Sequence, residues 1–290
     1  MELEALLDTL RAAARKAAEA ALEVEAEGRR LEVVGRGESG DTTLAADKAA
    51  EDAAIREILS RLGSARIVSE EAGEKDFGEK PRYTFVIDPV DGSRNYKRGI
   101  PLYAVSIAAA EGSTLGSVVA GVVYAPRLGA EFYAVKGRGA YLNGEPISAS
   151  GAERLPGSLV GLSTTPKAQF LPYLVAEELS RRGAVLRSWG SVSVEVAFLS
   201  AGGLDAYLEA WGTMRVVDVA AALLIAREAG AEVRMAGKLS RDPSLKLDER
   251  LSMVVAATPS LASELEDAYR AALGWEPLRV FEVMGAAPLR

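Results

Sequence analysis

The segment Tyr83-Thr84-Phe85-Val86-Ile87-Asp88-Pro89-Val90-Asp91-Gly92-Ser93 joins a hydrophobic run to a short turn that carries two carboxylates. The run over residues 83–87 predicts a β-strand. Asp88 then lies at a strand end, where a parallel-type sheet presents its ligand site. Asp-Pro and Asp-Gly are turn dipeptides, so a plain turn is the simplest interpretation. That interpretation does not explain why two carboxylates follow a buried strand at this spacing. On such a turn, both carboxylates and the carbonyl of Val90 can face one hard divalent cation, which prefers oxygen ligands.

The same turn offers groups that can bind an anion. Gly92 lets another backbone approach closely. If a short helix begins at Gly92-Ser93, its free N–H groups can bind a phosphate. Glu70-Glu71 follows a predicted strand over 66–69. Surface Glu pairs are usually solvated, but a carboxylate at a strand end is also suited to metal ligation or to activation of water.

Asp218 and Asp47 each have a structural and a functional interpretation. Asp218 precedes a predicted helix over 219–229 and can serve as its N-cap. Its apolar neighbours indicate that it points inward, where an isolated carboxylate is unfavourable and a metal would compensate. Asp47 lies in a predicted helix over 45–62, and a solvated helix face is the simple interpretation. In the functional interpretation, Asp47 polarises a hydroxyl group, and Ser93 is the expected partner.

The composition excludes several kinds of chemistry. The 290 residues include no histidine and no cysteine, which excludes Ser-His-Asp and Cys-His nucleophiles, Cys/His zinc sites and disulfides. General acid–base catalysis would then depend on Asp, Glu, Lys, Tyr or metal-bound water. The net charge of −7, without a long basic run, argues against a nucleic-acid partner. No apolar stretch has the length of a membrane span, so we expect no membrane association.

The N-terminus and the amide content predict where the protein works. The first 28 residues are acidic, Ala-rich and helical in period, unlike a signal or transit peptide, so we expect a cytoplasmic protein. The chain contains only two Asn and one Gln, and Arg far outnumbers Lys. Depletion of thermolabile residues together with abundant charge predicts a hyperthermophile source.

The order of predicted elements divides the chain into two halves. In residues 1–150, two helices are followed by closely spaced strands and turns, including a hairpin at Asn143-Gly144, which predicts a largely antiparallel sheet. Beyond a boundary at 150–157, strands and helices alternate, which predicts an α/β unit over 151–290. We therefore expect an N-terminal α+β subdomain with most of the metal ligands and a C-terminal α/β subdomain with Asp218.

Three motifs, Glu70-Glu71, Asp88–Ser93 and Asp218–Ala221, resemble in order and spacing those of the inositol monophosphatase/fructose-1,6-bisphosphatase superfamily of metal-dependent sugar phosphatases. The resemblance covers roughly residues 5–275 and is closest to the archaeal dual-specificity type. It implies a layered α/β/α/β/α sandwich that forms a homodimer. Val217 stands where the family usually has Trp, and Ser93 stands where it usually has Thr, which preserves the hydroxyl group.

The resemblance also implies a role for each site residue. Two or three Mg²⁺ ions would bind: one to Glu70, Asp88 and the Val90 carbonyl, a second to Asp88, Asp91 and Asp218, and a weaker third near Glu70 and the loop 35–41. Glu70 would activate water, helped by Ser93 and Asp47. The backbone of Gly92 and Ser93 would hold the phosphate. The remaining substrate contacts would be Arg187, Gly190, Ser191 and Glu209.

Several functions are compatible with this pattern. The leading hypothesis is a Mg²⁺-dependent phosphatase that acts on a sugar or polyol phosphate, inositol 1-phosphate or fructose 1,6-bisphosphate. Within the same superfamily, the alternative is a phosphatase for 3′-phosphoadenosine 5′-phosphate. Outside enzymes, the alternatives are a non-catalytic interaction protein and a cation-binding module without turnover. Acidic residues at every metal-ligand position disfavour a non-catalytic scaffold.

Overall fold

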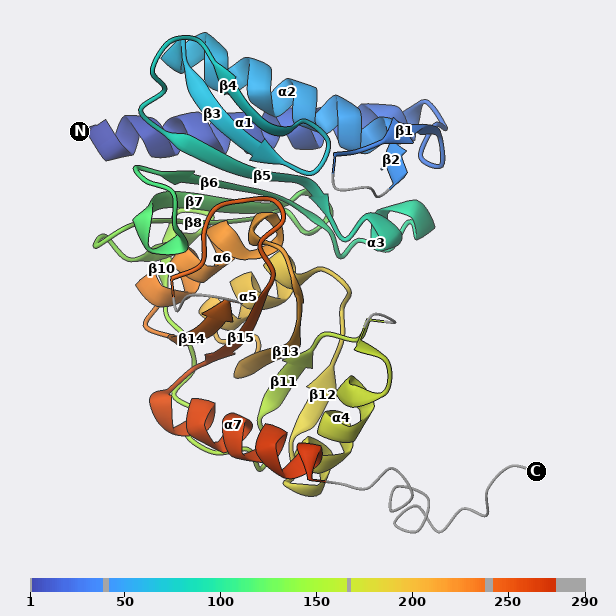
Figure 1. The fold of residues 1–290 in the computed structure, drawn as a ribbon, viewed down its shortest axis with the longest axis vertical. Coiled ribbons are helices and arrows are strands. Elements are labelled where there is room, and N and C mark those ends of the chain that lie inside the picture. The colour runs from blue at the N-terminus through green and yellow to red at the C-terminus, as the bar shows by residue number, and fades with distance from the viewer. Residues whose placement is uncertain (1, 39–41, 166–167, 238–241, 275–290) are drawn as a thin grey trace.

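An eight-stranded sheet and a five-stranded sheet alternate with three pairs of helices in five layers, and a two-stranded sheet lies apart from them (Figure 1). The computed structural model describes residues 2–38, 42–165, 168–237 and 242–274. Helices α1 and α2 cover one face of the larger sheet, α5 and α6 lie between the two sheets, and α4 and α7 cover the far face of the smaller sheet (Figure 1). The predicted α/β/α/β/α sandwich is therefore confirmed.

The helices are α1 (Glu2–Ala26), α2 (Ala45–Leu62), α3 (Ser93–Arg98), α4 (Leu171–Arg181), α5 (Val192–Ser200), α6 (Val216–Glu228) and α7 (Pro259–Leu273). The strands are β1 (Val33–Arg36), β2 (Thr42–Leu44), β3 (Ala65–Ser69), β4 (Gly73–Phe77), β5 (Thr84–Asp91), β6 (Ala104–Ala110), β7 (Val118–Ala125), β8 (Ala130–Val135), β9 (Ala140–Leu142), β10 (Glu145–Ile147), β11 (Leu159–Leu162), β12 (Val185–Arg187), β13 (Ala206–Met214), β14 (Glu232–Gly237) and β15 (Leu251–Ala256). Two short 3₁₀ turns, Leu115–Ser117 and Pro126–Leu128, flank β7.

The larger sheet has the strand order β10-β9-β8-β7-β6-β5-β3-β4, and the smaller sheet has the order β12-β11-β13-β15-β14. In the larger sheet only β3 and β5 pair in parallel, which confirms the expected antiparallel character of the first half. In the smaller sheet β11 pairs in parallel with β12 and β13, whereas β13, β15 and β14 pair antiparallel. The boundary expected at 150–157 falls between the two sheets, and the division into two subdomains stays a prediction.

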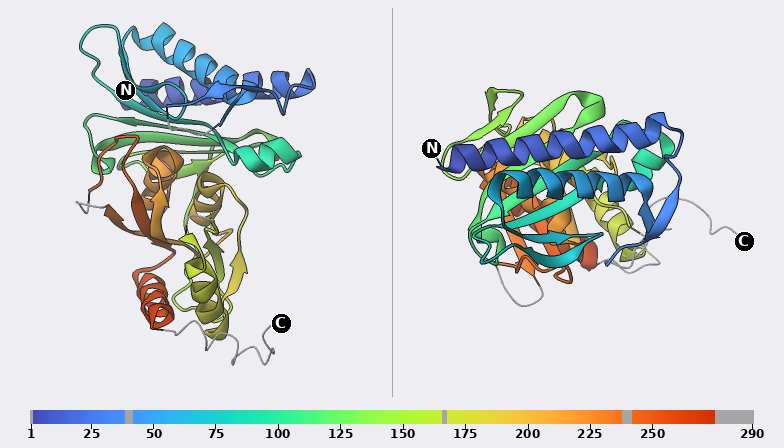
Figure 2. Two further views of the ribbon diagram at one scale, coloured as in Figure 1. Left: turned by 45° about the vertical axis from the view of Figure 1, so that its right-hand side comes forward. Right: turned by 90° about the horizontal axis from the view of Figure 1, so that it is seen from above.

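Strand β5 shows why the hydrophobic run over 83–87 does not alternate with polar residues. Phe85 and Ile87 belong to the core beneath α1 and α2, whereas Val86 belongs to the core shared with α5 and α6. A strand buried on both faces needs apolar side chains at successive positions. Seen from above, α1 and α2 run side by side across this sheet (Figure 2).

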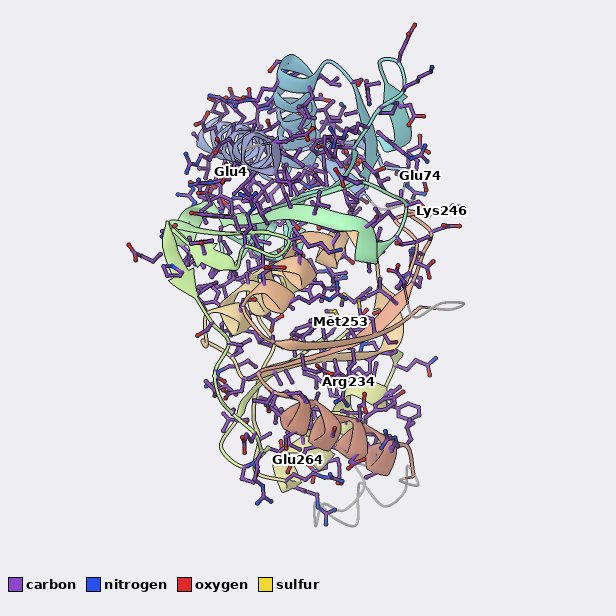
Figure 3. All side chains as sticks on the ribbon, turned by 90° about the vertical axis from the view of Figure 1, so that its left-hand side faces the viewer. Glu4, Glu74, Arg234, Lys246, Met253 and Glu264 are labelled. Atoms are coloured by element: carbon purple, nitrogen blue, oxygen red, sulfur yellow. The ribbon has the colours of Figure 1, made fainter. Side chains whose placement is uncertain are left out.

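In this five-layer arrangement, the outer helices carry polar side chains on their outward faces. Glu4 lies on α1 and Glu264 lies on α7, at opposite ends of the molecule, whereas Met253 lies between the outer layers (Figure 3). Met253 is 2% exposed.

Within the described residues, no helix combines the length and the apolar character that a membrane span requires.

Several predicted boundaries differ from the structure. Strand β5 continues past Asp88 to Asp91, through an irregularity in its pairing with β6. Strand β13 covers Ala206–Met214 rather than 204–209. Strands β1, β2, β4 and β14 were not predicted: β1 and β2 form a separate two-stranded sheet, and β4 is an edge strand with three exposed charged residues and lacks alternation. The tail beyond residue 274 lies outside the described residues.

Candidate active site

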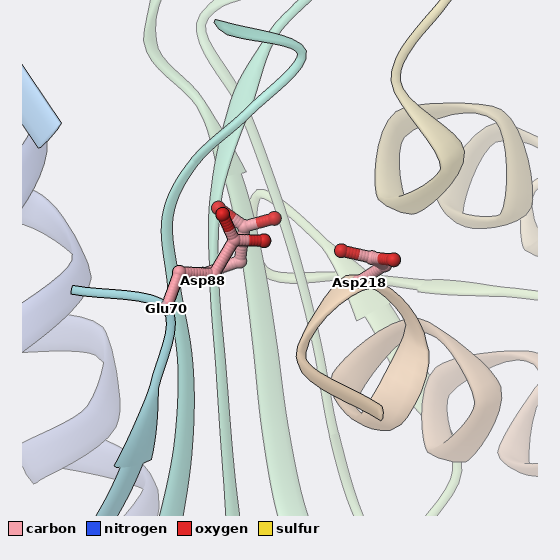
Figure 4. A group of neighbouring side chains, drawn as sticks. All are labelled: Glu70, Asp88 and Asp218. Carbon is pink, nitrogen blue, oxygen red and sulfur yellow. The ribbon is translucent and has the colours of Figure 1, made fainter. Parts of the chain in front are cut away.

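Three acidic side chains converge where the larger sheet faces α6. Glu70 directly follows β3, Asp88 lies in β5, and Asp218 lies in the first turn of α6. Val68 and Val86 face the layer of α5 and α6. Side chains alternate along a strand, so Glu70 and Asp88, each two positions further on, point to the same layer. The three residues each offer an oxygen within 4.8 Å of the others (Figure 4).

Burial and the repulsion of nearby charges disfavour the ionised forms of Glu70 and Asp88. Burial raises the pKa of Glu70 to about 8, and the nearby charge of Asp218 contributes, whereas Arg215 opposes the shift. Burial, with the charges of Glu70 and Asp91, holds the pKa of Asp88 well above its usual range. A bound cation would reverse this repulsion. The donor set consists only of carboxylate oxygens, which fits a hard divalent cation.

Asp91 is held by the start of α5, a helix from the other half of the chain. Its Oδ2 accepts hydrogen bonds from Ser191 Oγ at 2.7 Å, from Ser193 N at 2.7 Å and from Ser193 Oγ at 2.5 Å. Burial raises the pKa of Asp91 to about 6, although these hydrogen bonds counteract the shift. The sequence analysis missed Ser193, whose only signal is its place near the start of a predicted helix.

The irregular end of β5 shapes the turn that was predicted to bind a phosphate. The Val90 N–H donates to Asp88 Oδ1 at 3.1 Å, and Ser93 Oγ donates to the Val90 carbonyl at 3.0 Å. Gly92 has a φ of 92° and precedes α3, which confirms that a short helix begins here. A Cβ on Gly92 would lie 3.0 Å from both Leu102 O and Ser191 Cβ, so this position requires glycine.

Asp47 does not pair with the Ser93 hydroxyl, and that prediction was wrong. Asp47 Oδ2 accepts the N–H of Leu44 at 3.0 Å, because a carboxylate in the first turn of α2 can reach the free donor at the helix start. The Ser93 hydroxyl donates to Val90 instead. Within the described residues, Asp47 Oδ1 is buried without a hydrogen-bond partner. Burial raises the pKa of Asp47 to about 7.

The turn that carries Glu70 and Glu71 is fixed by residues that sequence reasoning passed over. Glu51 of α2 is buried, and its Oε1 accepts the Ser69 hydroxyl and, at 3.0 Å, the N–H of Ala72. Thr43 donates a hydrogen bond to Glu71. The carboxylate of Glu51 therefore supports both sides of the turn. Residues 39–41 of the loop 35–41, near which a third ion was expected, lie outside the described residues.

A cleft of about 430 Å³ opens beside this cluster, and Asp91, Asp218, Gly190 and Ser191 are among the residues that line it. Its other lining residues are mainly polar: Arg94, Asn95, Ser163, Thr164, Ser188, Trp189, Val192, Glu195, Tyr207, Met214 and Arg215. A larger cavity of about 520 Å³ lies between β5 and residues 244–246. It contains none of the three clustered carboxylates, so the smaller cleft is the candidate substrate site.

Asn95 joins the two halves of the cleft. Its Nδ2 donates to Leu102 O at 2.7 Å and to Trp189 O at 2.6 Å.

Two predicted sugar contacts lie elsewhere. Glu209 is fully buried and accepts the N–H and hydroxyl of Thr213 at 2.9 and 2.7 Å. Arg187 lies exposed on β12 and donates to the Leu186 carbonyl at 2.8 Å. Neither residue is among those that line the cleft.

One interpretation of the sequence made Asp218 the N-cap of α6, but the N-cap is Arg215. Helix α6 begins at Val216, three residues earlier than predicted, because the apolar run over 216–226 is buried as one helix. Asp218 is in the first turn, and its Oδ2 accepts the backbone N–H of Arg215 at 2.9 Å. Asp218 thus both caps the helix from within and belongs to the cluster. The sequence analysis did not single out Arg215, whose side chain contacts Glu70 and Asp218.

Comparison with known proteins agrees with this fold and site. The inositol monophosphatase family model matches residues 2–272. The fructose-1,6-bisphosphatase/inositol-1-monophosphatase of Methanothermobacter thermautotrophicus is 32% identical over 243 residues, which cover 81% of this chain and 85% of the relative. The bifunctional NADP phosphatase/NAD kinase of Methanocaldococcus jannaschii is 31% identical over 254 residues, 78% of this chain and 44% of that protein. The extragenic suppressor protein suhB from Bartonella henselae has the same fold, with a TM-score of 0.78, 24% identity, and coverage of 92% of this chain and 98% of the other.

The fold, the buried carboxylates and these relatives together define a metal-dependent phosphoric monoester hydrolase. More specifically, the match over nearly the whole chain shows that it belongs to the inositol monophosphatase family. The resemblance inferred from Glu70-Glu71, Asp88–Ser93 and Asp218–Ala221 is confirmed.

Proposed function

We propose that this protein uses Mg²⁺ to release phosphate from inositol 1-phosphate and fructose 1,6-bisphosphate. The observation that carries the proposal is the convergence of Glu70, Asp88 and Asp218 on one buried point. An all-oxygen donor set of this kind favours Mg²⁺ over softer ions. The names of the archaeal relatives, which combine both activities, support the choice of substrates.

The carboxylates would share two ions between them. Glu70, Asp88 and the Val90 carbonyl would hold the first ion, and Asp88, Asp91 and Asp218 would hold the second. A third ion would bind more weakly near Glu70 and the loop 35–41. When bound, such ions activate water and stabilise the departing oxygen of a phosphate ester.

The chain's own groups position the reactants and move the proton. With the ions bound, Glu70, which directly follows β3, would accept the proton of the attacking water. The N–H groups of Gly92 and Ser93, at the start of α3, would hold the phosphate oxygens. Asp91 keeps its orientation through the Ser191 and Ser193 hydrogen bonds. Hydrolysis of the ester then yields the free alcohol and inorganic phosphate.

The cleft supports a hydroxyl-rich substrate. Arg94, Asn95, Ser163 and Ser188 line it, and side chains of this kind donate and accept hydrogen bonds to sugar or polyol hydroxyls. Gly190 and Ser191 lie on the same wall. Arg187 and Glu209 do not line the cleft, so we assign no substrate contact to them.

Phosphate release should be measured with the purified protein and Mg²⁺ on inositol 1-phosphate, fructose 1,6-bisphosphate, NADP and 3′-phosphoadenosine 5′-phosphate side by side. We expect turnover of the first two, and none after chelation of the metal. Preference for NADP would instead match the activity named for the M. jannaschii relative. Mg²⁺-independent release would contradict the metal mechanism. Release from none of the four substrates would favour a non-catalytic interaction protein.

A further inference from the structure

Arg215 is a partly buried cation that forms ion pairs with two of the clustered carboxylates. It immediately precedes α6, and its side chain is 20% exposed. Its Nη2 forms an ion pair with Glu70 Oε1 and a second one, at 3.2 Å, with Asp218 Oδ1. Glu70 follows a strand of the larger sheet, whereas Asp218 lies on α6, so one guanidinium group joins two layers of the fold.

The position of Arg215 coincides with the place where a metal ion would act. Glu70 and Asp218 both contribute oxygens to the group within 4.8 Å that could hold a metal. The guanidinium group offsets part of the repulsion among these carboxylates, because its positive charge forms ion pairs with two of them. Replacing one of two partners in a buried ion pair is unfavourable, because it leaves a charge without compensation.

We propose that Arg215 is an internal counter-cation that stabilises the metal-free site and competes with the metal ion for Glu70 and Asp218. The inference rests on the proposed function, because it takes these carboxylates to be metal ligands. A metal ion and a guanidinium group cannot both approach the same carboxylate oxygens closely, since like charges repel in a partly buried site. Metal binding therefore requires Arg215 to leave Glu70 Oε1.

Two effects follow, with opposite signs. Removing the charge of Arg215 destabilises the metal-free protein, because the carboxylates lose their compensation. The same change strengthens metal binding, because the ion no longer displaces a cation. A residue that only supported the helix start would give the first effect and not the second.

The test compares Arg215→Met, which keeps an unbranched chain, with Arg215→Lys, which keeps the charge. Arg61→Met is the control for the loss of a surface charge: Arg61 pairs with Glu57 near the end of α2, at the other end of β3 from Glu70. Mg²⁺ affinity of the full chain is measured by calorimetry after metal removal, at about pH 8.5 to limit competition from protons. Melting temperatures are measured in chelator and at saturating Mg²⁺.

We expect Arg215→Met to bind Mg²⁺ about tenfold more tightly than the wild type, which corresponds to about 1.4 kcal/mol. Its melting temperature in chelator should fall, and its gain on adding Mg²⁺ should exceed that of the wild type. Arg215→Lys and Arg61→Met should stay near the wild type in both measurements. Unchanged or weaker Mg²⁺ binding by Arg215→Met would overturn the inference. A wild-type protein that binds no Mg²⁺ would overturn the proposed function itself, which separates the two failures.

Discussion

The close contact between Gly121 of β7 and Ala221 of α6 holds the helix that carries Asp218 against the larger sheet. A Cβ added at Gly121 would lie 3.0 Å from Ala221 Cα and 3.1 Å from Ala221 O. Both are backbone atoms, so the helix itself has to move. Asp218 lies one turn before Ala221, and a displaced α6 would carry its carboxylate away from Asp88.

The expected size of the Gly121→Ala effect follows from two opposing contributions. Overfilling a tightly packed core destabilises by roughly 1–3 kcal/mol. Replacing glycine by alanine also lowers the conformational entropy of the unfolded chain, and this stabilisation offsets roughly 0.4–1 kcal/mol of the loss. We expect a net loss of roughly 1–2 kcal/mol in the free energy of unfolding. Such a loss lowers the melting temperature by roughly 2–8 °C in a chain of this size.

Gly151→Ala is the matched control, because among the described residues no atom outside its chain neighbours lies within 4 Å of a Cβ at Gly151. Urea unfolding and Mg²⁺ calorimetry are measured for both variants. Gly121→Ala should lose stability and bind Mg²⁺ more weakly, whereas Gly151→Ala should keep the wild-type Mg²⁺ affinity and gain roughly 0.4–1 kcal/mol in stability from the restricted unfolded chain. Equal or higher stability of Gly121→Ala would refute the reasoning, and so would an equal loss in both variants.

Two further predictions concern buried carboxylates outside the cluster. Glu51→Ala should lower the free energy of unfolding in urea by roughly 2–4 kcal/mol and should lower kcat, because the Ser69 hydroxyl and the Ala72 N–H lose their acceptor and the turn at Glu70 loses its support. Glu51→Gln keeps an acceptor oxygen and should stay near the wild type. A Glu51→Ala variant as active as the wild type would argue against this role. Burial raises the pKa of Glu195 to about 8, so between about pH 4.5 and pH 8 the folded state holds a proton on Glu195 that the unfolded state has lost. Protonated Glu195 therefore contributes its full stabilisation below about pH 4.5, and this stabilisation is lost as the pH rises to about 8. The free energy of unfolding of Glu195→Gln should fall less over that range than that of the wild type, and parallel pH profiles would contradict the assignment.

Local pattern was sufficient to predict much of the fold and the main acidic positions. The apolar run before Asp88 is a strand buried on both faces, and the hairpin at Asn143-Gly144 forms as predicted between β9 and β10. Strand alternation explains why Glu70 and Asp88 face one layer once Val68 and Val86 are known to face it. These features depend on near neighbours in sequence, which is why the sequence alone predicts them.

The features that were missed depend on contacts between distant segments. Ser193 and Arg215 act through carboxylates that lie far from them in the chain, and nothing in their local sequence marks such contacts. Glu51 looks like a solvated helix residue until α2 packs against β3. The hydrogen bonds of Glu209 to Thr213 belong to the irregular part of β13, which local sequence does not indicate, and its substrate contact, implied by resemblance, stays a prediction.

Mg²⁺-dependent phosphate release by Asp88→Asn tests the metal site most directly. Asn has nearly the shape of Asp and can still accept the N–H of Val90 that Asp88 Oδ1 accepts at 3.1 Å, so the turn should keep its geometry. The variant should fold as the wild type does and lose more than about a hundredfold in kcat/KM on inositol 1-phosphate and fructose 1,6-bisphosphate. A folded Asp88→Asn protein with wild-type turnover would contradict the assignment of Glu70, Asp88 and Asp218 as the catalytic metal site.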